Sequence, residues 1–361
     1  MKKVIVGFCL VLSVVFLSGC SLSDYAPKND SKNSVVKIPT GSSFLKSTDG
    51  GFNWEAKMKI DDKADISGAS VLTMAVNPVD SKIVYLGTEA DGILKTIDGG
   101  ETWKKETFPL KVYGLVVDTQ NPQIVYASAL NNKRGKIYKK IADDAQWKEI
   151  YTEPGEDTFI TALAIDKFNP NILYAGTSQG VLIKSINGGE SWINIKKKAD
   201  RAIVSITIDA RNANLVYFGI FQQGIWRSKD GGNEVEDITQ KINQSSNFSF
   251  NTAVYSAVAD PSIGGTIYLG TEHGMLRSTN GGEKWEVVNI IESSKAFPIR
   301  AIAINPFNSK EISYAAEKAI YKSVDNGVKW STFQLDTKRN VSVLKYNSQN
   351  MGIVYAGMRS F

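Results

Sequence analysis

Short runs of apolar and β-branched residues alternate along most of the chain with turn residues. One series comprises residues 71–76, 83–88, 92–96 and 103–107, with Asn-Pro, Asp-Gly and Gly-Gly between them. Runs of this length, bounded by Gly, Pro and Asn, are typical of β-strands joined by tight turns. The pattern predicts an all-β protein in which four strands make one unit.

The same unit recurs, marked by the pattern Ser-x-Asp-x-Gly-x-x-Trp, which we call the box. Seven boxes begin 49, 44, 45, 43, 50 and 45 residues apart and occupy residues 47–54, 96–103, 140–147, 185–192, 228–235, 278–285 and 323–330. A period of this length is typical of a β-propeller, in which each repeat is a four-stranded blade. The sequence therefore predicts one propeller of seven four-stranded blades over residues 41–361.

The two ends of the repeat region are incomplete in complementary ways. An apolar run ending in Tyr and small residues precedes every box except the first, and a last such run, at Tyr355, has no box after it. Joining the ends completes one blade and removes two open sheet edges. We therefore expect residues 44–47 to pair beside residues 353–357, so that the N- and C-terminal strands share a blade.

Each box contains the residues of a structural turn. Its Asp or Asn accepts backbone N–H groups, its Ser or Thr hydroxyl adds a bond, and Gly supplies a positive φ. The Trp packs between neighbouring sheets with its N–H at a partner. The residues expected in these roles are Asp49, Asp98, Asn187, Asp230, Asn280 and Asp325, together with Trp54, Trp103, Trp147, Trp192, Trp285 and Trp330.

Two boxes depart from the pattern. The third has Ala142 at the acidic position and Asp144 at the Gly position, and the fifth has Val235 in place of Trp. We expect these two blades to be less rigid or locally rebuilt.

The boxes at residues 46–54 (KSTDGGFNW) and 277–285 (RSTNGGEKW) resemble the Asp-box, or BNR, repeats of bacterial sialidases, sortilin, xyloglucanase-type glycoside hydrolases and photosystem II stability/assembly factor-like propellers. Residues 169–177 (NPNILYAGT) and 180–192 (GVLIKSINGGESW) resemble the last two groups most. The resemblance implies the propeller fold over residues 41–361, with each box at the blade's edge, away from the ligand. It implies no catalytic residue among the box acids, and these groups share boxes but not chemistry.

The first twenty residues resemble a bacterial lipoprotein signal. Lys2 and Lys3 precede an apolar run at residues 4–16 that is too short to span a bilayer comfortably, and residues 17–20 (LSGC) resemble a lipobox. The resemblance implies a signal peptide at residues 1–19 and acylation of Cys20, for example with palmitate. The protein would then be extracytoplasmic and lipid-anchored, on the cell membrane or the outer membrane. Residues 20–40 are expected to form a flexible tether.

Charge and composition limit the ligands. Forty-two basic and 37 acidic side chains give a net charge of +5 without a long basic run, which argues against a nucleic-acid partner. Two Cys and one His are too few for a disulfide framework or a common zinc site, and Cys9 lies in the segment that cleavage would remove. We therefore expect no metal and no cofactor.

Ligands of propellers usually meet the mouth of the central channel. First strands, the loops that enter them and the loops between second and third strands line this mouth. Seven polar residues in these positions form the predicted binding face: Lys133, Arg134, Arg201, Gln222, His273, Arg300 and Arg359. They suit an acidic or sugar-like ligand, and the alternative is an ordinary solvated loop face.

Three functional classes follow from the resemblance. Sialidases usually have an Arg-(Ile/Leu)-Pro phrase that is missing here, and xyloglucanase-type hydrolases use two Asp across a cleft between two seven-bladed domains, whereas these repeats fill one. Four loop carboxylates, Glu89, Asp91, Asp157 and Glu272, leave a glycosidase pair open. The third class, to which the photosystem assembly factors belong, implies a chaperone-like role at a membrane complex.

We predict a noncatalytic binding or assembly-scaffold propeller that is anchored to a membrane and presents its channel mouth to a protein partner. The alternative is a carbohydrate-active propeller, either a glycoside hydrolase or a glycan binder.

Overall fold

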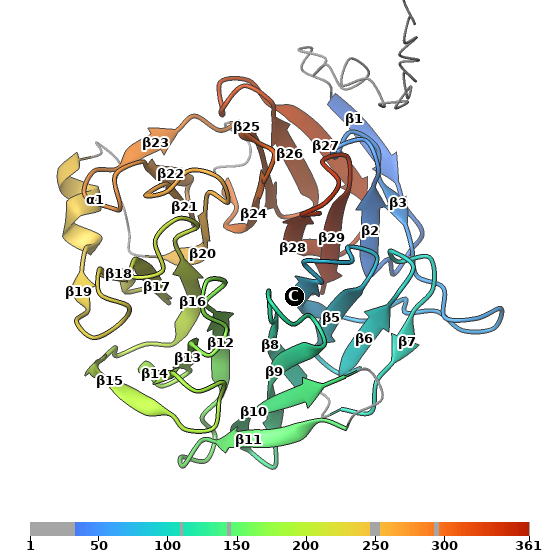
Figure 1. Ribbon diagram of the computed structural model, residues 1–361. Coiled ribbons are helices and arrows are strands. Elements are labelled where there is room, and N and C mark those ends of the chain that lie inside the picture. Colours follow the sequence, from blue (N-terminus) through green and yellow to red (C-terminus); the bar gives the residue numbers. More distant parts are fainter. Residues whose placement is uncertain (1–32, 109–110, 143–145, 246–252, 292–295, 361) are drawn as a thin grey trace, which may run out of the picture. The chain divides into compact units, whose positions relative to one another are not determined.

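The computed structural model describes residues 33–108, 111–142, 146–245, 253–291 and 296–360, and it is a seven-bladed β-propeller (Figure 1). The prediction of seven four-stranded blades is confirmed. The first three blades are β4 (Val71–Val76), β5 (Val84–Thr88), β6 (Ile93–Thr96) and β7 (Lys104–Lys105); β8 (Lys111–Val117), β9 (Ile124–Asn131), β10 (Arg134–Ile141) and β11 (Lys148–Thr152); and β12 (Ile160–Ile165), β13 (Leu173–Thr177), β14 (Val181–Ser185) and β15 (Ile193–Lys198).

The remaining blades repeat this antiparallel order. The fourth to sixth are β16 (Ile203–Ile208), β17 (Val216–Ile220), β18 (Gly224–Ser228) and β19 (Glu236–Asp237); β20 (Val254–Ala259), β21 (Ile267–Thr271), β22 (Met275–Ser278) and β23 (Glu286–Val288); and β24 (Ile299–Asn305), β25 (Asn308–Ala316), β26 (Ala319–Ser323) and β27 (Ser331–Asp336). The seventh comprises β28 (Asn340–Tyr346), β29 (Val354–Arg359), β2 (Phe44–Ser47) and β3 (Glu55–Ala56), and a short helix, α1 (Thr239–Ser245), follows β19.

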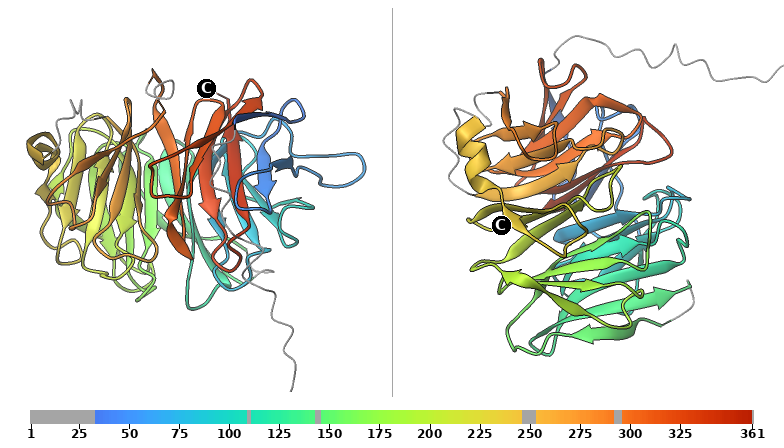
Figure 2. Two further views of the ribbon diagram at one scale, coloured as in Figure 1. Left: turned by 90° about the horizontal axis from the view of Figure 1, so that it is seen from above. Right: turned by 60° about the vertical axis from the view of Figure 1, so that its left-hand side comes forward.

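The first strand of each blade lies at the centre of the ring and contacts the first strands of both neighbours. The contact of β28 with β4 closes the circle. Strands run between two faces, as the side views show (Figure 2). We call the face with the loops between second and third strands the mouth face and the opposite face the box face. All seven boxes lie on the box face, where a backbone N–H of each box bonds to a carbonyl in or directly beside the loop between the first and second strands of its own blade.

Both ends of the repeat region share the seventh blade, as predicted. Strand β2 pairs antiparallel with β29, with Phe44 opposite Gly357 and Ser47 opposite Val354. The aromatic ring of Phe44 then packs against Trp103 of the first blade, with ring centroids 4.8 Å apart. The core therefore lies between blades, and the closing strand belongs to it.

The expectation of a flexible tether over residues 20–40 needs a correction in its last part. Residues Asn33–Lys37 form strand β1, which adds in parallel to the outer edge of β27. The physical reason is apolar burial, because Val36 and Ile38 pack on the core between the sixth and seventh blades. The described propeller therefore begins at residue 33, and Cys20 lies outside the described residues.

Six boxes form the same turn. In the first, the Ser47 hydroxyl donates to an Asp49 carboxylate oxygen at 2.8 Å, and the same oxygen accepts the N–H of Asn53 at 2.9 Å. The N–H of Gly51 donates to the Ser47 hydroxyl at 2.8 Å, where the backbone has a φ of +99°. Equivalent bonds occur at Asp98, Asn187, Asp230, Asn280 and Asp325.

The box Trp residues mostly find hydrogen-bond partners. The indole N–H of Trp54 and that of Trp285 donate to a Gly carbonyl of their own box. Those of Trp103 and Trp330 donate to Lys57 and Asn289 in the preceding blade. Trp192 differs, because its buried indole N–H has no partner among the described residues.

A second bond system joins several boxes to the blade before them, through the basic residue that precedes a box and, at two boxes, also through the Tyr of a second strand. Tyr126 and Lys139 of the second blade donate to the Gly188 carbonyl of the third at 3.1 and 3.2 Å. Tyr174 and Lys184 donate in the same way to Gly231. Burial raises the pKa of Tyr126 to about 12, so its hydroxyl stays a donor. We call these bonds the interblade latches.

Ion pairs occur at both irregular boxes, although the fifth keeps the regular turn at Asp230. In the third, Lys140 pairs with Glu106 at 3.0 Å, and the same carboxylate accepts the indole N–H of Trp147 at 2.8 Å. Ala142 has a φ of +116°, and Asp144 lies outside the described residues. In the fifth, Val235 packs in the core cluster of Trp226, and the buried Arg227 pairs with Glu236 and Glu283.

Replacing a box carboxylate should lower stability without changing the fold. We expect Asp325→Ala to cost about 1–3 kcal/mol, because the carboxylate accepts the Ser323 hydroxyl and the N–H groups of Val328 and Lys329. Asp49→Ala and Asp98→Ala should behave alike. Urea unfolding measures the loss, and Asp336→Ala, at an exposed position of the same blade, is the matched control.

The free energy of unfolding that Asp325→Ala removes should also depend on pH. Burial acts to raise the pKa of Asp325, but hydrogen bonds from Lys329 and Ser323 outweigh it and hold the pKa below its usual value. A lowered folded-state pKa stabilises above the unfolded value of about 3.9, and this stabilisation disappears as the pH falls through the folded value. The difference between wild type and Asp325→Ala should therefore shrink below about pH 4. A constant difference would contradict the carboxylate's role.

Candidate functional site at the channel mouth

All seven first strands carry a β-bulge at the same position, next to the mouth. The first or second residue of each is an aliphatic residue that is at most 1% exposed, and the pairing register shifts by one residue directly after it. A bulge leaves one residue outside the ladder and turns its side chain away from the regular alternation. The seven half-buried bulge residues form the bulge ring: Leu72, Tyr113, Thr161, Val204, Tyr255, Arg300 and Ser342.

Hydroxyl groups from the preceding blade hold several bulges in place. The Thr161 hydroxyl donates to the Ile203 carbonyl at 2.6 Å, and the Ser342 hydroxyl donates to the Val71 carbonyl at 2.7 Å. Ser128 and Ser256 bond in the same way to Ile160 and Ile299. Because each bond crosses a blade boundary, the bulge ring is part of the rigid ring of first strands.

The first aromatic pair of the mouth surrounds Tyr113. Its ring stacks on Phe159, with centroids 5.9 Å apart and an interplanar angle of 15°. Lys111 places its ammonium 5.6 Å from the Tyr113 centroid. Phe159 comes from the loop that enters the third blade, so this pair joins two blades at the mouth.

The second aromatic pair surrounds Tyr255. Phe221 meets its ring edge-on, with centroids 6.4 Å apart, and the Arg300 guanidinium lies 5.0 Å from the Tyr255 centroid. Burial lowers the pKa of Arg300, and the positive charge of Arg359 adds to this effect. This side of the mouth therefore combines aromatic surface with closely spaced cations.

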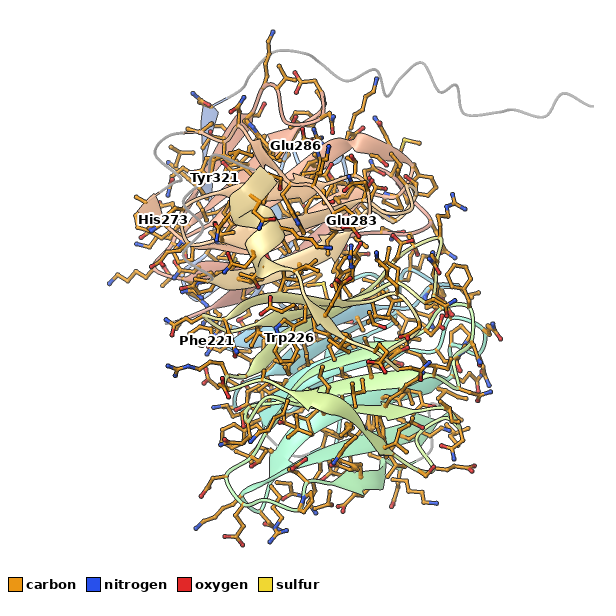
Figure 3. All side chains as sticks on the ribbon, turned by 90° about the vertical axis from the view of Figure 1, so that its left-hand side faces the viewer. Phe221, Trp226, His273, Glu283, Glu286 and Tyr321 are labelled. Atoms are coloured by element: carbon orange, nitrogen blue, oxygen red, sulfur yellow. The ribbon has the colours of Figure 1, made fainter. Side chains whose placement is uncertain are left out.

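The predicted binding residues are spread over the mouth and make different interactions. Arg300 belongs to the bulge ring, and Arg359 lies 3.9 Å from Glu89, which also pairs with Lys111 at 3.5 Å. Arg134 contacts the loop into the third blade, because it donates to the Pro154 carbonyl at 2.7 Å and pairs with Glu156 at 3.4 Å. Lys133, Arg201, Gln222 and His273 are exposed in their loops. Figure 3 shows His273 and Phe221 at the mouth edge and Glu283 displaced toward the box face.

Three of the four loop carboxylates have different surroundings. Glu89 is committed to the two ion pairs above, Asp91 lies 3.4 Å from Lys105, and Asp157 is exposed with a φ of +53°. Within the described ranges, no group of three or more His, Cys, Asp and Glu side chains is placed to hold a metal ion. The same part of the chain has no helix with the length and apolar character needed to cross a bilayer.

Sequence reasoning missed the aromatic half of the mouth. Tyr113, Tyr255 and Phe159 fit the apolar pattern of strands and their ends, and so give no sign of exposure. The available signal was an aromatic or charged residue directly after the buried aliphatic start of a first strand, as in Val112-Tyr113, Val254-Tyr255 and Ile299-Arg300.

Two cavities lie near these elements. The central channel holds a cavity of about 580 Å³ lined mainly by aliphatic first-strand side chains, with the exposed Lys345 in its wall. A groove of about 860 Å³ lies beside the rebuilt third box, lined by Trp103, Trp147, Tyr138 and lysines that include Lys95 and Lys105. The groove combines aromatic and cationic surface away from the mouth.

The chain matches no family model and no curated protein sequence. Several solved structures are similar to it in fold. A GH74 enzyme from Niastella koreensis has a TM-score of 0.65 and 17% identity over 87% of this chain and 52% of its own. The GH74 xyloglucanase from Xanthomonas campestris has a TM-score of 0.67 and 14% identity over 81% and 51%. This chain therefore spans about half the length of these two enzymes.

Two YCF48 structures are similar to the chain as well. YCF48 bound to a D1 peptide has a TM-score of 0.60 and 14% identity over 80% of this chain and 92% of its own. YCF48 from Cyanidioschyzon merolae has a TM-score of 0.61 and 14% identity over 80% and 95%. These likenesses establish the fold alone. They include GH74 enzymes and YCF48, so no function follows from them.

Proposed function

We propose that this protein is a noncatalytic, lipid-anchored, extracytoplasmic propeller that presents its channel mouth to a protein partner. The observation that carries the proposal is the bulge ring, which places Tyr113, Tyr255 and Arg300 at one rim with Phe159 and Phe221 packed beside them. Tyr and Arg are the residues most enriched among the energetic centres of protein interfaces.

The chemistry of this rim suits an extended peptide segment with apolar and acidic side chains. The aromatic rings offer flat apolar surface, and Lys111, Arg300 and Arg359 offer cations beside it. Because the hydroxyl bonds between blades hold several bulges in place, little side-chain or backbone entropy would be lost on binding. The likeness to YCF48, a protein solved with a bound peptide and spanned almost entirely by this chain, supports the same class.

Mouth substitutions should weaken binding without unfolding the protein. We expect Tyr255→Ala and Arg300→Glu each to weaken partner capture at least about tenfold, as for an interface centre. Lys133→Glu with Arg201→Glu should mainly slow association, with a strong dependence on salt. Capture from membranes of the native organism, with the partner then purified for kinetics, gives the measurement. Lys284→Glu, an exposed lysine on the box face, is the matched control.

A glycan is the second candidate ligand, because the groove beside Trp147 combines aromatic rings with lysines. A glycan array run beside the capture experiment separates the two ligands. Sialyl and xyloglucan substrates should give no product above a blank. Release of sugar that is lost in Asp91→Asn or Glu272→Gln would overturn the noncatalytic proposal.

The anchor has its own test. A palmitate label should follow the wild-type protein and be absent from Cys20→Ser, which should leave the membrane fraction. If the wild-type protein carried no palmitate label, the lipid anchor would be refuted. The proposed binding at the mouth would still be tested by the mouth variants.

A further inference from the structure

The chain joins the propeller at the box face. Strand β1 runs parallel to β27, with Asn33 beside Thr332 and Lys37 beside Asp336. Strand β27 begins at Ser331, directly after the box that ends at Trp330. Asn33 therefore lies at the box-face end of the sheet, and everything N-terminal to it is attached to the propeller at that face.

The same face carries exposed apolar side chains at the tips of its inner loops. Val79, Phe168, Ile263 and Phe307 are 62%, 48%, 50% and 50% exposed. They lie in the loops between first and second strands of four different blades, two or three residues beyond the Asx residue that ends the first strand. These side chains therefore stand around the channel at one level, and further out the boxes add Ile97 and Ile186, 65% and 63% exposed.

Within the loops between first and second strands, cations lie among these tips and most of the acids are turned inward, whereas the boxes further out carry both exposed lysines and exposed acids: Lys229, Lys284 and Lys329, and Glu101, Glu190, Asp230, Glu234 and Glu283. Lys82, Lys167, Arg211 and Lys310 are exposed in or directly beside the same loops. The acids that open four of the loops, Asp118, Asp166, Asp209 and Asp260, are at most 6% exposed and accept backbone N–H groups. Asp80 is the only exposed acid in the seven loops, all of which are described.

We propose that the box face is a docking surface for an anionic phospholipid bilayer. The apolar tips would enter the headgroup region while the neighbouring cations contact lipid phosphates, the combination that holds peripheral proteins at a membrane surface. The mouth then faces away from the membrane, toward a partner. This proposal rests on the proposed anchor at Cys20.

Chain length makes the anchor and the surface compatible. The thirteen peptide units from Cys20 to Asn33 reach at most about 45 Å, at roughly 3.3–3.6 Å per residue. An acylated Cys20 would therefore keep the box face within that distance of the lipid, and such tethering raises the effective concentration of weak contacts. Contacts of the four apolar tips with the lipid would then orient the propeller.

The experiment uses the full-length lipoprotein in vesicles of phosphatidylcholine and phosphatidylglycerol. Phe168→Cys and Phe307→Cys place a thiol on the box face, and Phe221→Cys and His273→Cys place one on the mouth face. Each is labelled with a polarity-sensitive fluorophore, and brominated lipid is the quencher. The wild type should take up no label, because Cys9 would be removed and Cys20 acylated. We expect a blue shift and loss of fluorescence at the two box-face labels and neither change at the mouth.

A second pair of variants tests the apolar tips directly. Phe168→Asp with Phe307→Asp should abolish quenching of a label at Ile263→Cys, whereas Phe297→Asp, at an exposed mouth-face Phe, should leave it unchanged. Circular dichroism confirms that each variant is folded.

Three results would overturn the proposal. If the protein were anchored to the vesicles but brominated lipid quenched neither the box-face labels nor the mouth labels, the docking surface would be refuted and the anchor would not. If the wild-type protein did not bind the vesicles and its Cys20 took up the fluorophore, both the anchor and the docking surface would be refuted. A blue shift at the box-face labels that depends on protein concentration in the absence of lipid would show that this face binds a second copy of the chain.

Discussion

Deleting residues 353–361 is expected to abolish the cooperative thermal transition of the propeller. Strand β29 lies in the middle of the seventh blade and pairs with both β28 and β2. Val354, Tyr355 and Met358 on this strand are at most 1% exposed. Burial of three such side chains contributes about 5–9 kcal/mol, which is comparable to the whole stability of a typical domain, about 5–15 kcal/mol.

The deletion should therefore leave β28 and β2 without a partner and open the ring. Melting followed by circular dichroism measures the loss, with removal of residues 360–361 as the control, since Ser360 is exposed and lies beyond β29. A truncated protein that melts like the parent would show that the ring does not depend on this closure.

The second large effect is expected at Lys322. Its side chain is 1% exposed, and its ammonium donates to the Gly50 carbonyl at 2.5 Å, to Glu311 at 2.8 Å and to the Tyr346 hydroxyl at 3.3 Å. Lys322→Met would leave the Glu311 carboxylate buried without its cation. Breaking a buried pair in this way costs about 3–5 kcal/mol.

The matched control for this position is Lys184→Met. Lys184 precedes its box as Lys322 does, and it donates to the Gly231 carbonyl at 2.7 Å with no ion pair recorded for it in the described structure. Losing one such bond costs about 1 kcal/mol. Urea unfolding of both variants compares the two values. Equal losses would show that the buried pair adds nothing to the interblade latch.

The large features of the fold could be predicted because they repeat. A box every 43–50 residues marks each blade, and the unmatched Tyr355 run indicates the closure. Strand β1 could not be predicted in this way. Its apolar content is two Val among polar residues, and its partner β27 is nearly three hundred residues away in the sequence.

The mouth was only half predictable for a related reason. Charged loop residues are visible in a sequence, but their partners are not, so the bonds of Arg134 to Pro154 and Glu156 could not be predicted. A bulge is invisible because a bulged strand has the same apolar composition as a straight one. Tyr113 and Tyr255 therefore looked like ordinary strand aromatics.

The interblade latches have a consequence for engineering this scaffold. Each latch ends on a carbonyl in a box, so the box face carries joints between blades as well as turns. A foreign domain inserted into a box would separate two blades, whereas the hairpin tip at Asn132 and Lys133, exposed on the opposite face, carries no latch. Grafts, fusions and new chain ends therefore belong at the hairpins between second and third strands, where exposed tips tolerate insertion best.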